Sequence, residues 1–336
     1  MSDRERKRMD DKKLLQIENL HVHYMSDGRE VKAVNGISLE VGEGETIGLV
    51  GETGAGKTTL ALAIMRLVQK PAGRYVDGEI LFHGENLLKT SEAYMNHIRG
   101  NQISMIFQDP MTSLNPVYTV GDQIAEVIAL HEHLNAKEAM ARAGEALEMV
   151  GIPRERAGEY PHQFSGGMKQ RVCIAMALAA NPQLLIADEP TTALDVTIQA
   201  QVLDLMGKLK RELKTAMILI THDLGIVSEV CDKVAIVYAG RIIEYGTCED
   251  IYRNPQHPYT VGLFHSIPKL DRKIARLTPI KGLMPDPANL PAGCAFAPRC
   301  NHACPACTQT EPQMEAIGET HRIACLRHRE IAAGKA

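Results

Sequence analysis

Residues 51–59, GETGAGKTT, have the types and spacing needed to hold a chain of phosphates. They match the pattern G-x-x-x-x-G-K-[ST], whose glycines let backbone N–H groups turn toward phosphate oxygens, while Lys57 adds a positive charge. The hydroxyl of Thr58 can ligate Mg²⁺. A glycine-rich structural turn is the alternative, but the apolar run before the loop and the helical spacing after it favour a nucleotide site. The candidate ligands in this loop are Gly51, Glu52, Thr53, Gly54, Ala55, Gly56, Lys57, Thr58 and Thr59.

A second segment, LLIADEP at residues 184–190, ends a buried-looking apolar run in two acids. Asp188 is placed to hold Mg²⁺ through water, and Glu189 to polarise a water molecule that attacks a phosphoryl group. Two acids at a strand end are more often a helix cap or a surface pair. Together with a phosphate loop, however, they complete a site for nucleotide hydrolysis.

Cysteines gather near the end of the chain, where residues 293–307, GCAFAPRCNHACPAC, hold four of the eight. Their chemistry depends on the redox compartment. Residues 1–13 are a run of mixed charge without the apolar core of a secretory signal, and no stretch approaches the roughly 20 apolar residues of a spanning helix. We therefore expect a flexible charged tail at 1–13, a reducing cytosolic environment, and clustered thiols that are metal ligands or catalytic groups rather than disulfides.

Composition disfavours nucleic acid as a partner. Lys plus Arg number 37 against 41 Asp plus Glu, which gives a formal net charge of -4. Aromatic residues make up only 4% and Trp is absent, so no platform for stacking bases is indicated.

The elements that must position these residues alternate between strand and helix. Apolar runs over residues 14–50 predict the strands of an antiparallel start, and helical spacing follows the phosphate loop. Further strands are expected at residues 78–84, 103–107, 183–187, 216–222, 233–240 and 241–246. The pattern over about 115–180 indicates an inserted helical subdomain, and after about 254 the composition shifts to Pro, His and Cys. This order predicts an α/β fold with a mainly parallel sheet, covered on both faces, and a small C-terminal extension.

The segment FSGGMKQR, residues 164–171, identifies a family by resemblance. Taken alone, Ser165, Gly166 and Gly167 could be a helix N-cap with a flexible approach. Placed about 20 residues before LLIADEP, they resemble the signature motif of ATP-binding cassette (ABC) proteins. The resemblance covers residues 14 to about 250 and implies a P-loop NTPase cassette at 14–253, with an antiparallel β subdomain, a RecA-like core and a helical subdomain. Met168 departs from the glutamine usual at the fifth signature position, a change we expect to be tolerated.

Other residues take their roles from the same resemblance. Tyr24 resembles the aromatic residue that stacks on adenine, and Gln108 the glutamine that contacts Mg²⁺ or the water and senses the membrane subunits. Asp195 ends a segment, TTALD, similar to the loop that crosses the dimer interface. His222 resembles the histidine that contacts the γ-phosphate.

The family resemblance also implies partners. ABC cassettes meet head to tail, so that each ATP lies between one phosphate loop and the signature of the other cassette. We expect a second ABC ATPase subunit, a paralogue or a second copy of this chain, together with two transmembrane permease subunits and an extracytoplasmic solute-binding protein. The cassette would then be peripheral, at the cytoplasmic face of the inner membrane. A soluble ABC ATPase acting on ribosomes or DNA is the alternative, but those usually carry two cassettes or a long coiled-coil insert.

The extension narrows the subgroup, because NPQHPYTVGLFHSIP and the residues after it resemble the tail of D-type subunits of dipeptide, oligopeptide and nickel importers. That resemblance implies import of dipeptides or oligopeptides, with nickel or another small solute as the alternative. It also picks out Cys294, Cys300, Cys307 and Cys325, which hold a [4Fe–4S] cluster in some members, and leaves Cys304 as an extra. Zn²⁺ stays open, although the uneven spacing is unlike a zinc ribbon. Because the tail is poor in apolar residues, we expect the metal to clamp it onto the cassette, with redox sensing as the rival role. His302, His321 and His328 could substitute as metal ligands, but histidines scattered in a polar tail are expected to be solvated.

Overall fold

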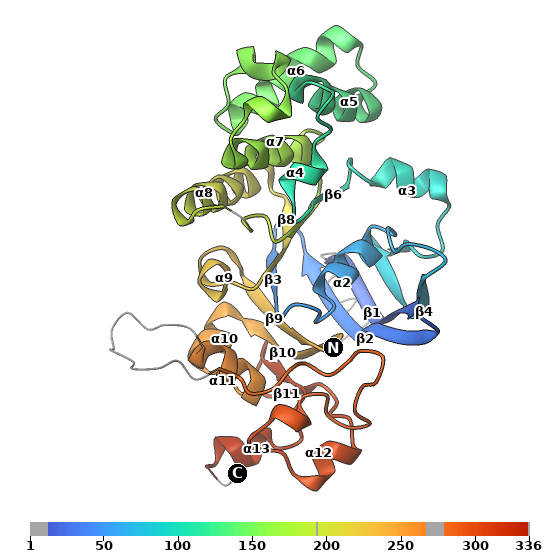
Figure 1. Ribbon diagram of the computed structural model, residues 1–336, viewed down its shortest axis with the longest axis vertical. Coiled ribbons are helices and arrows are strands. Elements are labelled where there is room, and N and C mark those ends of the chain that lie inside the picture. The colour runs from blue at the N-terminus through green and yellow to red at the C-terminus, as the bar shows by residue number, and fades with distance from the viewer. Residues whose placement is uncertain (1–12, 193, 267–278, 335–336) are drawn as a thin grey trace, which may run out of the picture.

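The computed structural model describes residues 13–192, 194–266 and 279–334. The charged tail expected at 1–13 lies outside these ranges except for Lys13, which begins the first strand. Figure 1 shows a central sheet with a helical part at one end, an antiparallel sheet at one side and the C-terminal segment at the other end.

The central sheet has eight strands within the described residues, in the order β11-β12-β10-β9-β3-β8-β7-β6. The pairs β9–β3, β3–β8, β8–β7 and β7–β6 are parallel, whereas β10, β12 and β11 are added antiparallel at one edge. The strands are β3 (Thr46–Val50), β6 (Ile103–Ile106), β7 (Leu184–Asp188), β8 (Ala216–Thr221), β9 (Lys233–Tyr238), β10 (Arg241–Thr247), β11 (Glu315–Ala316) and β12 (Arg322–Ile323).

The middle strands are buried on both faces, which explains why they read as continuous apolar runs. Alternate side chains enter two different cores: Ile218 and Ile220 of β8 pack toward the antiparallel sheet, while Met217 and Leu219 pack toward the helical part. The parallel core therefore fixes the carboxyl ends of β3, β6, β7 and β8 at one edge, where the candidate site residues follow.

The antiparallel sheet pairs β2-β1-β4-β5 and packs against helix α2 (Lys57–Ile64). Its strands are β1 (Lys13–Ser26), β2 (Arg29–Gly42), β4 (Gly73–Phe82) and β5 (Glu85–Asn86). After it come α3 (Glu92–Ile98) and β6, which returns the chain to the central sheet.

Residues 110–178 form the helical part at the top of Figure 1. Its elements are α4 (Pro110–Ser113), α5 (Val120–Glu132), α6 (Ala136–Met149), the 3₁₀ turns η1 (Arg154–Gly158) and η2 (Pro161–Gln163), and α7 (Gly166–Leu178). Side chains define where the helices begin: Thr119 caps α5, and Asn135 with Glu138 forms a capping box on α6. The core under α5 to α7 is continuous with the face of the central sheet that carries Met217 and Leu219.

Helices α8 (Val196–Leu213), α9 (Leu224–Val230), α10 (Cys248–Arg253) and α11 (Pro258–His265) follow β7, β8, β10 and α10 in turn. The remaining segment carries η3 (Ala297–Arg299), α12 (Pro305–Gln309), β11, β12 and α13 (His328–Ala332). The sequence predicts an extension that depends on metal for its attachment. In the structure it is joined to the cassette by the pairing of β12 with β10 and by Phe296, which is buried in the main core.

Candidate functional site

The phosphate loop connects the buried strand β3 to helix α2, as the spacing of its glycines predicts. Gly54 and Gly56 have φ values of 83° and 102°, in the left-handed region where glycine is favoured. A Cβ on Gly56 would also lie 2.3 Å from the carbonyl oxygen of Ala33. The loop therefore needs these glycines both for its conformation and for its close approach to β2.

The side chain of Lys57 is buried, and its ammonium group lies inside the phosphate loop. Its Nζ donates to the carbonyl oxygens of Gly51, at 2.7 Å, and Glu52, at 3.0 Å. Burial lowers the pKa of Lys57, and the nearby acids Glu189 and Asp188 oppose that change. The Lys57 ammonium group thus already lies at the place where the phosphate oxygens of a nucleotide would bind.

Asp188 ends β7 and lies 2% exposed beside the loop. Burial raises its pKa, while a hydrogen bond from Thr58 lowers it. Among the described residues, no hydrogen-bond partner reaches its Oδ1 atom. A buried carboxylate oxygen without a partner, next to a threonine hydroxyl at the start of α2, is a donor set that suits Mg²⁺, so Thr58 and Asp188 fit the ion.

Glu189 is the centre of a polar cluster at the end of β7. Its Oε2 atom accepts hydrogen bonds from Gln108 Nε2 at 3.1 Å and Thr192 Oγ1 at 2.8 Å, and its Oε1 atom lies 3.4 Å from His222 Nδ1. Burial alone would raise the pKa of Glu189, but the hydrogen bond from Thr192 and the charge of His222 outweigh it, so the pKa is lowered. A carboxylate ionised at neutral pH is thereby available to accept a proton.

The residues around Glu189 come from separate segments that the central sheet brings together. Gln108 follows β6 and His222 follows β8, both on the exposed side of the cluster. Sequence reasoning placed these two beside the phosphate loop only through the family resemblance. It missed Thr192, whose only signal is its position three residues after Glu189.

The signature segment lies away from the phosphate loop of the same chain. Ser165 is the N-cap of α7, where its side chain accepts from the backbone of Met168, and α7 and α2 are well separated in Figure 1. A Cβ on Gly167 would lie 2.5 Å from a side-chain carbon of Ile198, so α8 packs directly on this turn. The structure therefore does not bring Ser165, Gly166 and Gly167 to the site made by this chain's own loop.

Two neighbours of the signature have clear local roles. Asp195 is the N-cap of α8 and accepts from the backbone N–H of Ile198 at 2.9 Å. Met168, the departure from the family pattern, has its sulfur 3.4 Å from Nη1 of Arg156, whose guanidinium lies over the Phe164 ring. The methionine is thus accommodated in a packed setting beside the glycines.

Tyr24 lies on β1, half-buried at the edge of the second core, opposite Val31 of β2 and Gly73 of β4. Its ring is in contact range of the Gly73 position. These neighbours belong to the antiparallel sheet, so the part that Tyr24 plays at adenine stays a prediction.

The cysteines predicted to act together line one small cavity at the base of the extension. Cys294, Cys300, Cys307 and Cys325 all border it, together with Phe296, His302 and Arg327, whereas Cys304 does not. Burial raises the pKa of each of the four lining thiols, that of Cys325 to about 11. Within the described residues, no group of three or more His, Cys, Asp or Glu side chains is arranged to hold a single metal ion.

Two tail histidines are not solvated, contrary to the expectation from sequence. His321 is 4% exposed and its Nε2 atom lies 2.8 Å from the Glu244 carboxylate. His328 is 8% exposed, with Nδ1 2.8 Å from the carbonyl oxygen of Cys325. Long-range packing of the extension, which local composition does not reveal, explains both.

Taken together, the sheet, the phosphate loop and the acids at the end of β7 define an ATP-binding cassette. Residues 34–192 match the family described as ABC transporter, and residues 243–307 match the oligopeptide/dipeptide transporter C-terminal region. The chain is 50% identical to the oligopeptide transport ATP-binding protein OppD of Bacillus subtilis (strain 168), over 93% of this chain and 88% of that protein. It is 49% identical to the dipeptide transport ATP-binding protein DppD of the same strain, over 93% and 94%. The chain belongs to the family of ABC transporter ATP-binding proteins with the oligopeptide/dipeptide C-terminal region.

Solved structures agree with this fold. A dimeric ATP-binding cassette in a post-hydrolysis state with ADP and Pi superposes with a TM-score of 0.63 at 26% identity, covering 70% of this chain and 98% of that one. The cassette cbiO1 of Clostridium perfringens, part of an ABC transporter complex, gives a TM-score of 0.62 at 28% identity, covering 75% and 95%. None of the helices described here is both long and apolar enough to cross a bilayer.

Proposed function

We propose that this chain is the ATP-hydrolysing subunit of an ABC importer that takes up dipeptides or oligopeptides. The observation that carries the proposal is the convergence of Gln108, Glu189 and His222 beside the phosphate loop, in a chain half identical to OppD and DppD. The solute class comes from the names of these relatives and from the match of residues 243–307.

In the proposed mechanism, residues 51–59 bind the phosphates through backbone N–H groups and Lys57, which exchanges its two carbonyl partners for phosphate oxygens. Thr58, Asp188 and Gln108 would hold Mg²⁺, which when bound would supply positive charge to offset that of the phosphates. Glu189 accepts a proton from the attacking water, Gln108 orients that water, and His222 contacts the γ-phosphate. Tyr24 stacks on the adenine ring.

A second cassette is required, because Ser165, Gly166 and Gly167 lie in another part of this chain from its own phosphate loop. We place them against the nucleotide of the partner, where the N-terminus of α7 favours negative charge. A paralogous subunit is the partner we propose, and the dimeric state of the solved neighbour with ADP and Pi supports a paired arrangement.

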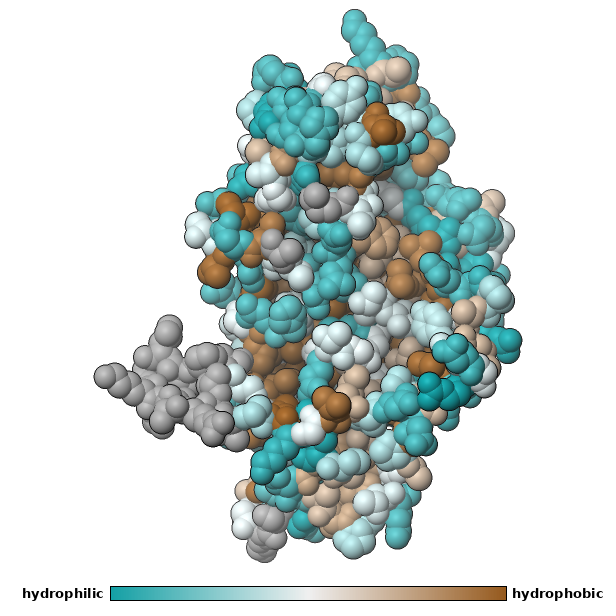
Figure 2. All heavy atoms as spheres, viewed as in Figure 1, coloured by the Kyte–Doolittle hydropathy of each residue, from teal (hydrophilic) through white to brown (hydrophobic). Residues whose placement is uncertain are grey.

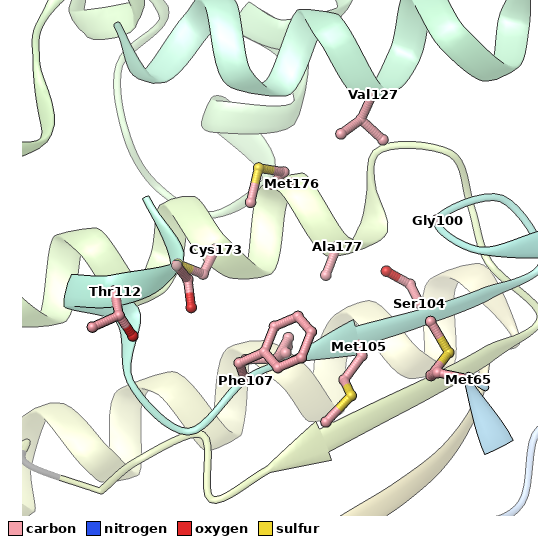
Figure 3. A pocket seen from close by; sticks show the side chains of 12 residues that line it. Met65, Gly100, Ser104, Met105, Phe107, Thr112, Val127, Cys173, Met176 and Ala177 are labelled. Atoms are coloured by element: carbon pink, nitrogen blue, oxygen red, sulfur yellow. The ribbon is translucent and has the colours of Figure 1, made fainter. Parts of the chain in front are cut away.

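The permease subunits are proposed to dock in a groove between β6 and the helical part. This groove has a volume of about 590 Å³ and is lined by Met65, Met105, Phe107, Val127 and Met176, among others. Figure 3 shows Phe107 and Met105 facing the α7 residues Met176 and Ala177 across it. Flexible methionines suit a short helix from another chain. Docking here would hold the cassette at the cytoplasmic face of the membrane, with a solute-binding protein delivering peptide from the other side.

The cysteine cavity is proposed to hold a [4Fe–4S] cluster ligated by Cys294, Cys300, Cys307 and Cys325. Four thiols around one cavity are the donor set of such a cluster, and Arg327 on the same wall would offset its negative charge. When bound, the cluster would link four separate points of the extension. Iron with matching acid-labile sulfide in anaerobically purified protein is the expected composition, and zinc without sulfide would replace the cluster by a Zn²⁺ site.

The function is tested with Glu189→Gln in the assembled transporter. Loss of the proton acceptor is expected to lower ATP hydrolysis by about 100-fold or more while MgATP binding is kept. Uptake of labelled dipeptides and oligopeptides should fall with hydrolysis, and Glu249→Gln, at an exposed side chain of α10, serves as the control. Hydrolysis at the wild-type rate would show that Glu189 is not the base. Uptake of nickel but not of peptides would show that the chain belongs to a nickel importer, the alternative function.

A further inference from the structure

Glu52, the second residue of the phosphate loop, is held from three directions. Its backbone N–H donates to the hydroxyl of Tyr259 at 3.0 Å, and its carbonyl oxygen accepts from Lys57. Its carboxylate receives Nη1 of Arg299, 3.1 Å from each oxygen. Both Tyr259 and Arg299 lie beyond residue 253, so the C-terminal segment contacts the phosphate loop directly.

Arg299 is well placed to hold that contact rigidly. Its side chain is 6% exposed, against 32% for Glu52, so the ion pair is largely removed from water. Arg299 also donates through Nε to the carbonyl oxygen of Lys281 at 2.9 Å and through Nη1 to the hydroxyl of Tyr238 at 3.3 Å. A guanidinium fixed by this many acceptors gives its remaining partner a defined position.

Aromatic rings pack around the segment that carries Arg299. Phe296 lies three residues before Arg299, and its ring packs 5.3 Å from that of Tyr238 and 5.4 Å from that of Tyr259, measured between centroids. Phe296 is 4% exposed and also lines the cysteine cavity. The buried rings of Phe296, Tyr238 and Tyr259 therefore pack the segment that carries Arg299 against the end of β9.

A second contact reaches the phosphate loop from the same segment. A Cβ placed on Gly54 would lie 3.1 Å from the terminal carbon of Met284, so the methionine lies beside this part of the loop. Nearby, the backbone N–H of Lys32 on β2 donates to the carbonyl oxygen of Pro287 at 2.9 Å. The segment from Met284 to Arg299 thus contacts the phosphate loop at two positions, Gly54 and Glu52, and β2 at Lys32.

We infer that Arg299 is a positioning residue for ATP binding, acting through Glu52. This inference rests on the proposed function, since ATP is taken to be the ligand of the loop. Arg299 fixes the first turn of the loop, which reduces the conformational freedom lost when the phosphates bind. It also neutralises Glu52, an acid within the loop that would otherwise repel the phosphates.

The test is the dissociation constant of MgATP, measured by calorimetry on the full chain purified anaerobically. Arg299→Gln is expected to raise the Kd roughly 5- to 20-fold, as is typical of coupling between sites. Arg299→Lys keeps the charge but loses the fork of donors, so its Kd should rise roughly 2- to 5-fold. Adding Glu52→Gln to Arg299→Gln removes the unneutralised acid and should recover part of the affinity.

The matched control is Glu311→Gln, which breaks the ion pair between Arg241 of β10 and the C-terminal segment, away from the phosphate loop. It is expected to change the melting temperature but not the Kd. If Arg299→Gln binds MgATP as wild type does, or if Glu311→Gln weakens binding equally, Arg299 is only an anchor and the inference is wrong. Should Arg299→Gln not fold, an unchanged Kd for Arg299→Lys overturns it instead. A wild-type chain that fails to bind MgATP would contradict the proposed function, not the role of Arg299.

Discussion

At the scale of single residues, Glu189 shows how the fold accepts local strain at the site. Its φ of 47° places a non-glycine residue in the left-handed region, which costs roughly 1–3 kcal/mol. The conformation persists because the backbone N–H of Glu189 donates to the carbonyl oxygen of Ile220 on β8, at 2.9 Å. Neighbouring strands therefore hold the backbone, and the side chain can face Gln108 and His222.

At the residue scale, we predict that substitutions of Cys300 and Cys304 have different effects on metal content. Cys300→Ser removes one thiol from the cavity, so iron and sulfide content should fall to near zero; Cys304→Ser, outside the cavity, should leave both unchanged. Metal and sulfide analysis of the two proteins, with visible absorption spectra, makes the comparison. Equal metal content in both variants would contradict the ligand set, and normal folding and transport without metal would contradict a clamping role.

Residue types in short motifs could be predicted from sequence, because glycines at Gly54 and Gly56 and acids at the end of an apolar run report local requirements. Arg299 could not be predicted, because it meets Glu52 only through tertiary folding. The grouping of Cys294 with Cys325 came from a family pattern, and their spacing alone would not have shown that they border one cavity.

At the scale of elements, one buried carboxylate joins three segments. Glu244 of β10 is 0% exposed and accepts from the backbone N–H groups of Gln256, at 2.7 Å, and His257, at 3.0 Å, just before α11. The ring of His321, just before β12, completes the set at 2.8 Å. Local sequence gave no signal for this network, whereas the strand β10 itself was expected from its apolar residues.

Glu244→Gln is therefore predicted to lower the free energy of unfolding by about 2–4 kcal/mol at pH 7, because an amide nitrogen would face donors. Burial would raise the pKa of Glu244, but the hydrogen bond from His321 and the backbone donors lower it below the ordinary 4.5. The unfolded chain thus protonates first, so this stabilisation is complete above pH 4.5 and is lost as the pH falls through the folded pKa.

Denaturant unfolding at pH 7 and below pH 4.5 checks this, with Glu315→Gln on the exposed strand β11 as control. The difference between wild type and Glu244→Gln should shrink in acid. A difference that is the same at both pH values would mean that the Glu244 carboxylate adds no stability through its charge.

At the scale of the whole molecule, the groove beside β6 and the polar cluster around Glu189 are adjacent in sequence and in space. Phe107 is 44% exposed in the groove, and the next residue, Gln108, donates to Glu189. Figure 2 shows apolar residues gathered at the waist, between the helical part at the top and the antiparallel sheet at the right. A chain that fills the groove would therefore contact the segment that carries Gln108, the residue proposed to orient the attacking water.

Phe107→Asp is predicted to weaken co-purification with the permease subunits by about tenfold or more, because a charge would enter an apolar groove. The MgATP Kd should stay at the wild-type value, since Phe107 lies outside the phosphate loop. Val76→Asp, which alters an apolar residue 53% exposed on β4, is the matched control. Equal recovery of both variants with the permease would place the docking surface elsewhere.

The position of β12 has a consequence for synthesis of the chain. β10 pairs with β9 on one side and with β12 on the other, although β12 is translated well after both. Until the ribosome has released Arg322 and Ile323, that edge of the central sheet has unpaired backbone groups able to join a strand of another molecule. In the interval between the completion of β10 and the arrival of β12, the nascent cassette therefore carries an open strand edge at Glu244 and Tyr245 that favours aggregation.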